Sequence, residues 1–263
     1  MLAFRLLGEL EVVGGGRDIA PSAPRVKAVL ALLALNPNRV VSAEALSEEL
    51  WDDRPPRSAA TTTQTYIYQL RRILGSLPAA GGTGCELATR APGYVLRVEE
   101  GRIDATRFLA MVAAGRDLWR QDQVEAAAIR LRQALELWRG PALADIGMGP
   151  RLRVHAAHLT EMRLRALELR IQADARLGRH SELIPELRLL VAEHRLNERL
   201  HAQLIDSLSR EGRRAEALQA YQDLRRVLRT ELGLEPAPEI QRLQAEVLTG
   251  AGSGVLSGAS RAG

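Results

Sequence analysis

The sequence is poor in residues that several protein classes require. It contains one cysteine, Cys85, and one lysine, Lys27, and 3% of its residues are aromatic. A single cysteine excludes a disulfide within the chain and favours a reducing, cytoplasmic location, where a lone thiol is by default idle. No run of about 18 uncharged apolar residues is present, so we expect no membrane-spanning helix. Residues 1–5 also lack the start of a signal peptide.

Motifs of enzyme chemistry are also missing. Gly14-Gly15-Gly16 is not followed by Gly-Lys-Ser/Thr, so it indicates a turn rather than a nucleotide-binding loop. No Gly-x-Ser-x-Gly motif and no paired cysteines occur. His155, His158 and Glu161 could share one side of a helix, which leaves a metal-dependent hydrolase as an alternative. Without a fourth ligand, solvated or packed histidines are the better interpretation, and we expect no enzyme activity, metal or cofactor.

Size and charge permit a nucleic-acid-binding protein without requiring one. The chain has 263 residues, 46% of them hydrophobic, which is enough for one large or two modest domains. Its net charge is +4 and its sequence pI is about 9.8. Because nearly all of its cations are arginine, as in chains from GC-rich genomes, the arginine content alone is weak support for DNA binding.

Residues 58–74 are expected to form a helix with two different faces. Thr63, Ile67, Leu70 and Leu74 follow one another at helical spacing and fall on one face. The opposite side carries hydroxyl, amide, guanidinium and phenol groups, from Ser58, Thr61, Thr62, Thr65, Tyr66, Tyr68, Gln69 and Arg72. These groups suit base edges and phosphates in a major groove. An ordinary surface helix would show the same pattern, so the neighbouring segments decide the interpretation.

The neighbours complete a winged helix-turn-helix. Short strands at 2–6, 9–13 and 17–19 precede a buried helix at 24–35, which opens on Pro24. A second helix at 42–51, with Ser42 as its cap and Leu46 and Leu50 inward, leads through a tight loop into 58–74. Two strands at 86–90 and 94–98 then form a hairpin with Arg90 at its tip, where a narrow minor groove would favour a guanidinium.

This order resembles the OmpR-type winged helix-turn-helix family. Thr65-Tyr-Ile-Tyr-Gln-Leu-Arg-Arg-Ile-Leu74 is similar to that family's recognition helix, and its wing arginine and Gly-Tyr pair fall on Arg90 and Gly93-Tyr94. Thr65 and Gln69, one helical turn apart, are expected to read bases, and glutamine favours adenine edges. Tyr68, Arg71 and Arg72 are expected beside phosphates. The resemblance also implies that the loop before the recognition helix, which includes Trp51, Asp52, Asp53 and Arg54, contacts RNA polymerase.

The second half of the chain is predicted to be all helical. Apolar residues recur at helical spacing in seven segments, which are residues 104–120, 123–139, 151–177, 181–195, 198–211, 214–230 and 239–248. Leu177-Gly-Arg-His-Ser-Glu-Leu183 is similar to Glu211-Gly-Arg-Arg-Ala-Glu-Ala217, so the repeat period equals that of tetratricopeptides. Such helix pairs stack into concave surfaces that bind partners. A plain helical bundle with accidental similarity is the alternative.

The two halves together resemble the Streptomyces antibiotic regulatory protein family. Three segments look like its bacterial transcriptional activation domain: Asp104-Ala-Thr-Arg-Phe108, Leu135-Glu-Leu-Trp-Arg-Gly-Pro-Ala-Leu143 and Glu231-Leu-Gly-Leu-Glu-Pro236. The resemblance implies an activator of a secondary-metabolite gene cluster that binds direct repeats near a promoter, as a homodimer on DNA. Its expected partners are double-stranded promoter DNA and RNA polymerase holoenzyme, through the sigma or alpha subunit.

The predicted fold is therefore mainly α with a small β part, in three segments. Residues 1–98 form the DNA-binding domain, whose helices and wing are expected to complete one core. Residues 103–249 form the tetratricopeptide-like activation domain, and the Gly-, Ala- and Ser-rich residues 250–263 form a disordered tail or linker. We expect a cytoplasmic, nucleoid-associated protein. A helical-repeat adaptor that binds proteins without reading DNA is the runner-up function.

Overall fold

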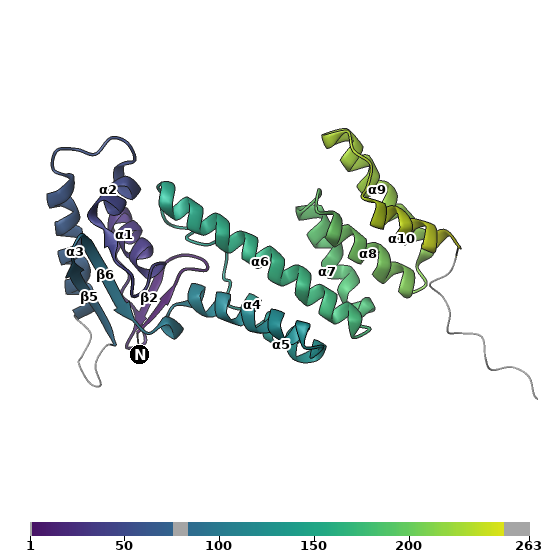
Figure 1. Cartoon of the computed structure of the whole chain (residues 1–263), viewed down its shortest axis with the longest axis horizontal. Coiled ribbons are helices and arrows are strands. Elements are labelled where there is room, and N and C mark those ends of the chain that lie inside the picture. The colour runs from purple at the N-terminus through teal and green to yellow at the C-terminus, as the bar shows by residue number, and fades with distance from the viewer. Residues whose placement is uncertain (1, 76–83, 250–263) are drawn as a thin grey trace, which may run out of the picture. The chain divides into compact units, whose positions relative to one another are not determined.

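The computed structural model describes residues 2–75 and 84–249, which form two compact units (Figure 1). Among these residues, the first unit comprises 2–75, 84–117 and 129–166, and the second comprises 118–128 and 167–249. The first unit thus continues beyond residue 98, where the sequence predicts a domain boundary. The tail predicted at 250–263 lies outside the described residues.

The β structure of the first unit consists of two small antiparallel sheets. One has the order β1 (Ala3–Arg5), β2 (Glu11–Gly14), β3 (Arg17–Asp18). The other has the order β4 (Val41–Ser42), β6 (Gly93–Val98), β5 (Cys85–Arg90). The predicted strands and hairpin are confirmed, whereas β4 was not expected from the sequence. It has two residues, too few for the alternation by which a strand is recognised.

Three helices pack in the first unit as helix-turn-helix logic predicts. They are α1 (Pro24–Ala34), α2 (Ala43–Trp51) and α3 (Ala59–Gly75) (Figure 1). The Ser42 hydroxyl accepts a hydrogen bond from the Ala45 amide at 3.0 Å, which confirms it as the cap of α2. α3 buries Thr63, Ile67, Leu70 and Leu74, the face that the spacing predicts. Both α1 and α2 contact α3, so this face is fixed against them.

The remaining helices follow the predicted pattern. They are α4 (Asp104–Arg120), α5 (Val124–Leu135), α6 (Pro150–Arg176), α7 (His180–Glu193), α8 (Glu198–Arg210), α9 (Arg214–Leu232) and α10 (Pro238–Thr249). In the second unit α8 packs against α7, α9 and α10. Gly178 and Gly212, one repeat apart, both take left-handed backbone angles, with φ of 77° and 73°, and turn the chain into the next helix. In the part of the chain that the structure describes, no helix is long and apolar enough to cross a membrane.

The end of α5 differs from its prediction. The pattern predicts a helix to Arg139, but α5 ends at Leu135. The amides of residues 136–138 still bond back to the end of the helix, but later amides bond to the main chain of the N-terminal segment: Arg139 to Leu7 O at 2.8 Å, Leu143 to Leu6 O at 3.0 Å and Ala144 to Gly8 O at 3.1 Å. A helix to Arg139 would use the Arg139 amide internally, so its bond to Leu7 is incompatible with a helix that includes this residue.

Two aspartates of the helical half bind the N-terminal strands. Asp104 accepts hydrogen bonds from the Leu6 amide at 2.7 Å and the Leu7 amide at 3.1 Å. Burial raises the pKa of Asp104, although these N–H groups and Arg139 oppose the shift. Asp145 accepts from the Leu10 amide at 2.7 Å and from the Lys27 ammonium. Burial acts to raise the pKa of Asp145 too, but the bonds from Lys27 and Leu10 outweigh it and the pKa is lowered.

A third carboxylate makes the reverse connection, from α2 to the start of α6. Glu49 has 4% of its surface exposed and accepts hydrogen bonds from the amides of Gly149 at 2.6 Å, Arg151 at 3.0 Å and Leu152 at 2.9 Å. A Cβ on Gly149 would lie 2.0 Å from the Glu49 carbonyl oxygen, so only glycine allows this approach. Among the described residues, those up to 98 therefore contain neither all the partners of their own buried N–H groups nor the helix end that Glu49 caps.

Removing the Glu49 carboxylate is expected to destabilise the protein strongly. Glu49→Ala leaves three amides at the start of α6 without their acceptor, which should lower the free energy of unfolding by about 2–3 kcal/mol. Glu48→Ala is the matched control. Glu48 forms an ion pair with Arg151 at 2.6 Å, and more than 40% of each of the two side chains is exposed. Its loss should cost about 0–1 kcal/mol. Urea unfolding of both variants measures the difference, and equal losses would contradict this role for Glu49.

Candidate nucleic-acid interface

The outward face of α3 is polar and contains no carboxylate. Of the residues predicted to contact DNA there, Thr61, Thr65, Tyr68, Gln69, Arg71 and Arg72 are exposed, and Thr62 and Tyr66 are half-buried. Tyr68 has 65% of its surface exposed, which is unusual for an aromatic residue that serves only packing. A carboxylate-free face that carries arginines can approach phosphates without charge repulsion.

Two exposed side chains on this face, Thr65 and Gln69, are those that the sequence predicts to contact base edges. The Thr65 hydroxyl donates to the Thr61 carbonyl oxygen at 3.0 Å, so its lone pairs and methyl group remain available on the surface. Gln69 stands one helical turn later and is exposed, and its side-chain amide makes no hydrogen bond to another described residue. A glutamine amide offers both a donor and an acceptor, the pair that an adenine edge requires.

The wing is the hairpin of β5 and β6. Arg90 is the last residue of β5, pairs with Gly93 across the turn, and is exposed. A Cβ on Gly93 would lie 2.0 Å from the Val41 carbonyl oxygen, so β4 approaches β6 more closely than a side chain would allow. This contact fixes one edge of the hairpin, and the Arg90 guanidinium extends from its tip into solvent.

The two arginines at the end of α3 differ in their surroundings. Arg71 donates from Nε to the Leu87 carbonyl oxygen at 2.9 Å and from Nη2 to the Thr89 hydroxyl at 2.7 Å. Its guanidinium is thus bound to the wing, although the sequence predicts a position beside phosphates. Arg72 is exposed, and its guanidinium makes no hydrogen bond to another described residue. The sequence has no local signal for the wing contact, because the partners lie 16 and 18 residues away.

The loop before α3 lies at the end of α2. Trp51 is half-buried, and the Arg25 guanidinium lies 5.6 Å from its ring centroid, within range of a cation–π interaction. Asp52, Asp53 and Arg54 are exposed, and Asp52 takes a positive φ of 54° as the chain leaves the helix. The two carboxylates are therefore accessible, on a segment separate from the polar face of α3.

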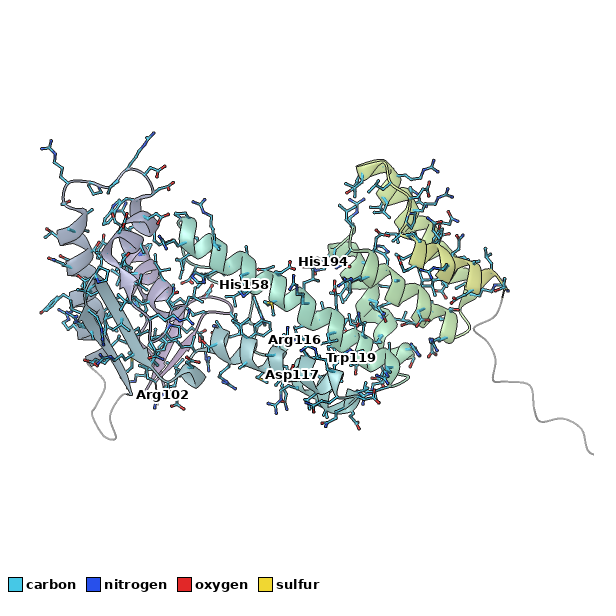
Figure 2. All side chains as sticks on the ribbon, viewed as in Figure 1. Arg102, Arg116, Asp117, Trp119, His158 and His194 are labelled. Atoms are coloured by element: carbon cyan, nitrogen blue, oxygen red, sulfur yellow. The ribbon has the colours of Figure 1, made fainter. Side chains whose placement is uncertain are left out.

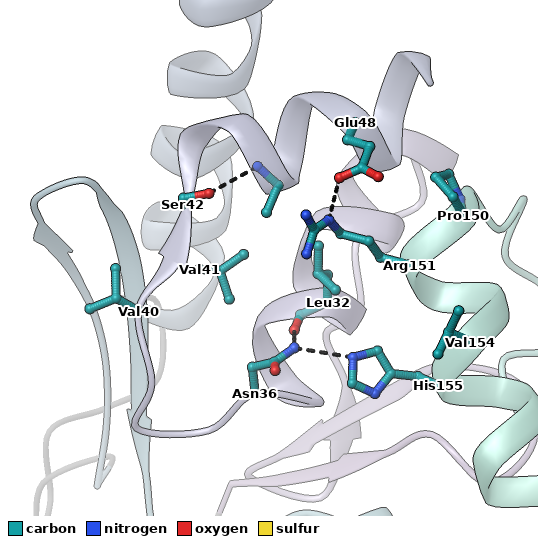
Figure 3. Close-up of a pocket in the computed structure, with 11 residues that line it drawn as sticks. Leu32, Asn36, Val40, Val41, Ser42, Glu48, Pro150, Arg151, Val154 and His155 are labelled. Atoms are coloured by element: carbon teal, nitrogen blue, oxygen red, sulfur yellow. Dashed lines mark hydrogen bonds and ion pairs between the residues drawn. The ribbon is translucent and has the colours of Figure 1, made fainter. Parts of the chain in front are cut away.

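The histidines of the metal alternative lie in different surroundings. His155 is half-buried in a groove of about 540 Å³ between α1, α2 and α6, where the Asn36 amide nitrogen lies 3.4 Å from its Nε2 (Figure 3). Burial lowers the pKa of His155, and the positive charges of His158 and Arg151 add to the shift. His158 is exposed on α6 (Figure 2), and Glu161 pairs with Arg165 at 2.9 Å. Among residues 2–75 and 84–249, no three His, Cys, Asp or Glu side chains are grouped to hold a metal ion.

Cys85 begins the wing and has the properties of an unreactive thiol. Burial raises its pKa to about 11, although the positive charge of Arg102 opposes the shift. At neutral pH the group is protonated, and a protonated thiol is a poor nucleophile.

Two family models match the chain and divide it near residue 100. The model described as "Transcriptional regulatory protein, C terminal" matches residues 20–96. The model described as "Bacterial transcriptional activator domain" matches residues 103–248, more than half of the chain. The matched ranges cover the helix-turn-helix with its wing and the helical half, respectively.

Relatives with both parts are regulatory proteins. Regulatory protein DnrI of Streptomyces peucetius is 40% identical over 250 residues, which cover 94% of this chain and 92% of DnrI. Regulatory protein AfsR of Streptomyces coelicolor is 36% identical over 248 residues, which cover 94% of this chain and 24% of AfsR. A structure of Mycobacterium tuberculosis EmbR in complex with a low-affinity phosphopeptide is 34% identical, with a TM-score of 0.88, and the match covers 94% of this chain and 65% of the EmbR chain.

Substitutions at Gln69 and Arg72 are expected to have different effects on DNA binding. Gln69→Ala should cost about 1–3 kcal/mol on the cognate site and relax the preference at one base position, because a base-edge contact is lost. Arg72→Ala should weaken binding to all DNA sequences alike, because a phosphate contact is lost. The slope of log affinity against log salt concentration should also become less steep by about one. Selection from randomised operators with each variant measures both quantities. An unchanged preference for Gln69→Ala would show that α3 does not read bases in this orientation.

Proposed function

The chain belongs to the Streptomyces antibiotic regulatory protein family of transcriptional activators, and we propose that it activates a secondary-metabolite gene cluster by binding direct repeats near the promoter and recruiting RNA polymerase. The observation that carries this proposal is the carboxylate-free, exposed face of α3, which lies beside a wing that ends in Arg90. A face of this composition can enter a major groove while the wing reaches the next minor groove.

The proposed contacts assign a separate task to each group of residues. Thr65 and Gln69 read base edges, and Arg90 occupies a minor groove. Thr61, Thr62, Tyr66, Tyr68 and Arg72 contact the sugar-phosphate backbone around the reading pair. Hydroxyl and phenol groups are suited to that role, because most hydrogen bonds between proteins and DNA go to phosphates and sugars and set the register.

The segment Trp51–Arg54 is proposed to contact RNA polymerase, through the sigma or alpha subunit. Asp52 and Asp53 are exposed and would repel phosphates, which suits a basic protein partner better than DNA. The same helix, α2, holds the start of α6 through Glu48 and Glu49. This connection supports a polymerase-facing surface that includes both α2 and the first turn of α6.

Footprinting of genomic DNA with the full chain, followed by gel shifts at increasing salt, tests the DNA-binding proposal directly. Binding that falls steeply as salt rises is expected, because counterions are released from neutralised phosphates. Indifference to DNA together with tight binding of a protein would favour a helical-repeat adaptor instead.

The spacing of the direct repeats is expected to control cooperative binding. Two protomers should need half-sites roughly 10–10.5 base pairs apart, so that both recognition helices enter the same face of the DNA. Inserting about five base pairs places the second site on the opposite face and should abolish cooperativity. Gel-shift titrations measure this, and insertion of a complete turn is the control that should largely restore it. Cooperativity that survives the half-turn insertion would contradict a dimer on one face.

Removing the two acids of the loop before α3 should separate activation from binding. Asp52→Ala combined with Asp53→Ala is expected to lower transcription from the target promoter while DNA affinity stays within about threefold, because the carboxylates lie off the DNA-reading face. Transcription in vitro and gel shifts on the same preparation give the two measurements. Glu44→Ala, which removes an exposed acid at the other end of α2, is the control and should change neither. Equal losses of transcription and affinity would overturn this assignment.

A further inference from the structure

The wing has an outer edge that requires a hydrogen-bonding partner. β5 is the terminal strand in the order β4-β6-β5, so β6 satisfies the main-chain groups on one side only. In terminal strands the other row of N–H and C=O groups must bond to water, to a side chain or to another element. Leu87 lies in the middle of β5, with its side chain buried and its carbonyl group within reach of α3.

Arg71 supplies that partner. Its Nε donates to the Leu87 carbonyl oxygen at 2.9 Å and its Nη2 to the Thr89 hydroxyl at 2.7 Å. Leu87 and Thr89 are two residues apart, so their side chains lie on the same face of the strand. A guanidinium is planar and rigid, so its two hydrogen bonds have fixed directions. They therefore fix both the position of β5 along α3 and its orientation relative to that helix.

We propose that Arg71 is the positioning residue of the wing: it holds β5 against α3 and thereby sets where the Arg90 guanidinium stands relative to the base-reading face. The inference rests on the proposed function, because Arg90 must enter a groove for its position to matter. Arg90 follows Thr89 directly, so a shift of the strand at Thr89 moves Arg90 with it. Arg71 thus affects sequence preference through Arg90.

Arg72 shows what the same residue type does without this contact. It follows Arg71 on α3 and is exposed, and its guanidinium makes no hydrogen bond to another described residue. The two arginines carry the same charge at consecutive positions of α3, and only Arg71 bonds to the wing, so effects that appear in Arg71→Ala and not in Arg72→Ala are attributed to those bonds. Arg72 is therefore the matched control.

A double-mutant cycle in the full chain tests the proposal. Arg71→Ala and Arg90→Ala should each weaken binding to the cognate site about tenfold, the effect of roughly one lost base-directed contact. The double variant should be little weaker than either single one, because both remove the same contact. Both singles should also lose the preference for A·T over G·C pairs where the wing meets the minor groove. In contrast, the fold losses of DNA affinity caused by Arg72→Ala and Arg90→Ala should multiply in the double variant, because the two residues act independently.

A second variant keeps the charge of Arg71 in place. Thr89→Val retains the shape of the side chain but removes the hydroxyl that accepts from Arg71, so it should shift the preference at the wing position in the same direction, by a smaller factor. Arg71→Lys should restore little of the preference, because an ammonium lacks the two fixed donors of the fork. Hydrogen exchange of the β5 and β6 amides should accelerate in Arg71→Ala and stay unchanged in Arg72→Ala.

Each result has one interpretation. Losses that multiply for Arg71→Ala and Arg90→Ala, or a preference at the wing position that Arg71→Ala leaves unchanged, would overturn the positioning role and assign Arg71 to phosphates. A wild-type chain that binds no DNA would overturn the proposed function. In that case, unchanged hydrogen exchange of the β5 and β6 amides in Arg71→Ala would also contradict the role of Arg71 in holding the wing, and accelerated exchange would support it.

Discussion

The structure depends on satisfying main-chain N–H and C=O groups that regular elements leave open at their ends and edges. Asp104 and Asp145 accept hydrogen bonds from amides between strands β1 and β2, and Glu49 caps α6. Arg71 donates to a carbonyl group of β5. In each case the side chain comes from a distant part of the chain. An unsatisfied buried N–H or C=O group costs about 1–3 kcal/mol, so these few side chains decide which segments can pack together.

The same bonds join the DNA-reading part to the start of the helical half. The family models divide the chain between residues 96 and 103. The first compact unit instead continues to residue 166, apart from residues 118–128. Both divisions hold, because a sequence family records which segments occur together and a compact unit records which segments share a core. Glu49 follows Glu48 on α2 and binds the first turn of α6, so the helix that leads into the exposed residues Asp52, Asp53 and Arg54 is fixed to the start of α6.

Most of the fold could be predicted from the sequence, because its helices have clear periodicity. The buried face of α3, the cap at Ser42, the wing and the repeat that places Gly178 and Gly212 in matching turns all have local patterns. The early end of α5, the strand β4 and the wing contact of Arg71 have none. Each of these depends on a partner that lies far away in the sequence, as Leu7 does from Arg139, and an arginine that binds a strand has the same local context as one that contacts a phosphate.

The chemistry of the reading face also bears on how many protomers are needed. Thr65 and Gln69 are uncharged, so the base contacts proposed for them would supply discrimination and little long-range attraction. Arg71 is exposed but its guanidinium is bound to the wing, so Arg72 and Arg90 are the arginines of α3 and the hairpin tip that are proposed to contact DNA. Each phosphate contact contributes about one unit of salt slope, and a protomer with so few of them binds non-specific DNA weakly. A second protomer on a repeated site doubles these contacts and adds base recognition. The modest charge of the interface is thus a physical argument for the proposed binding to direct repeats.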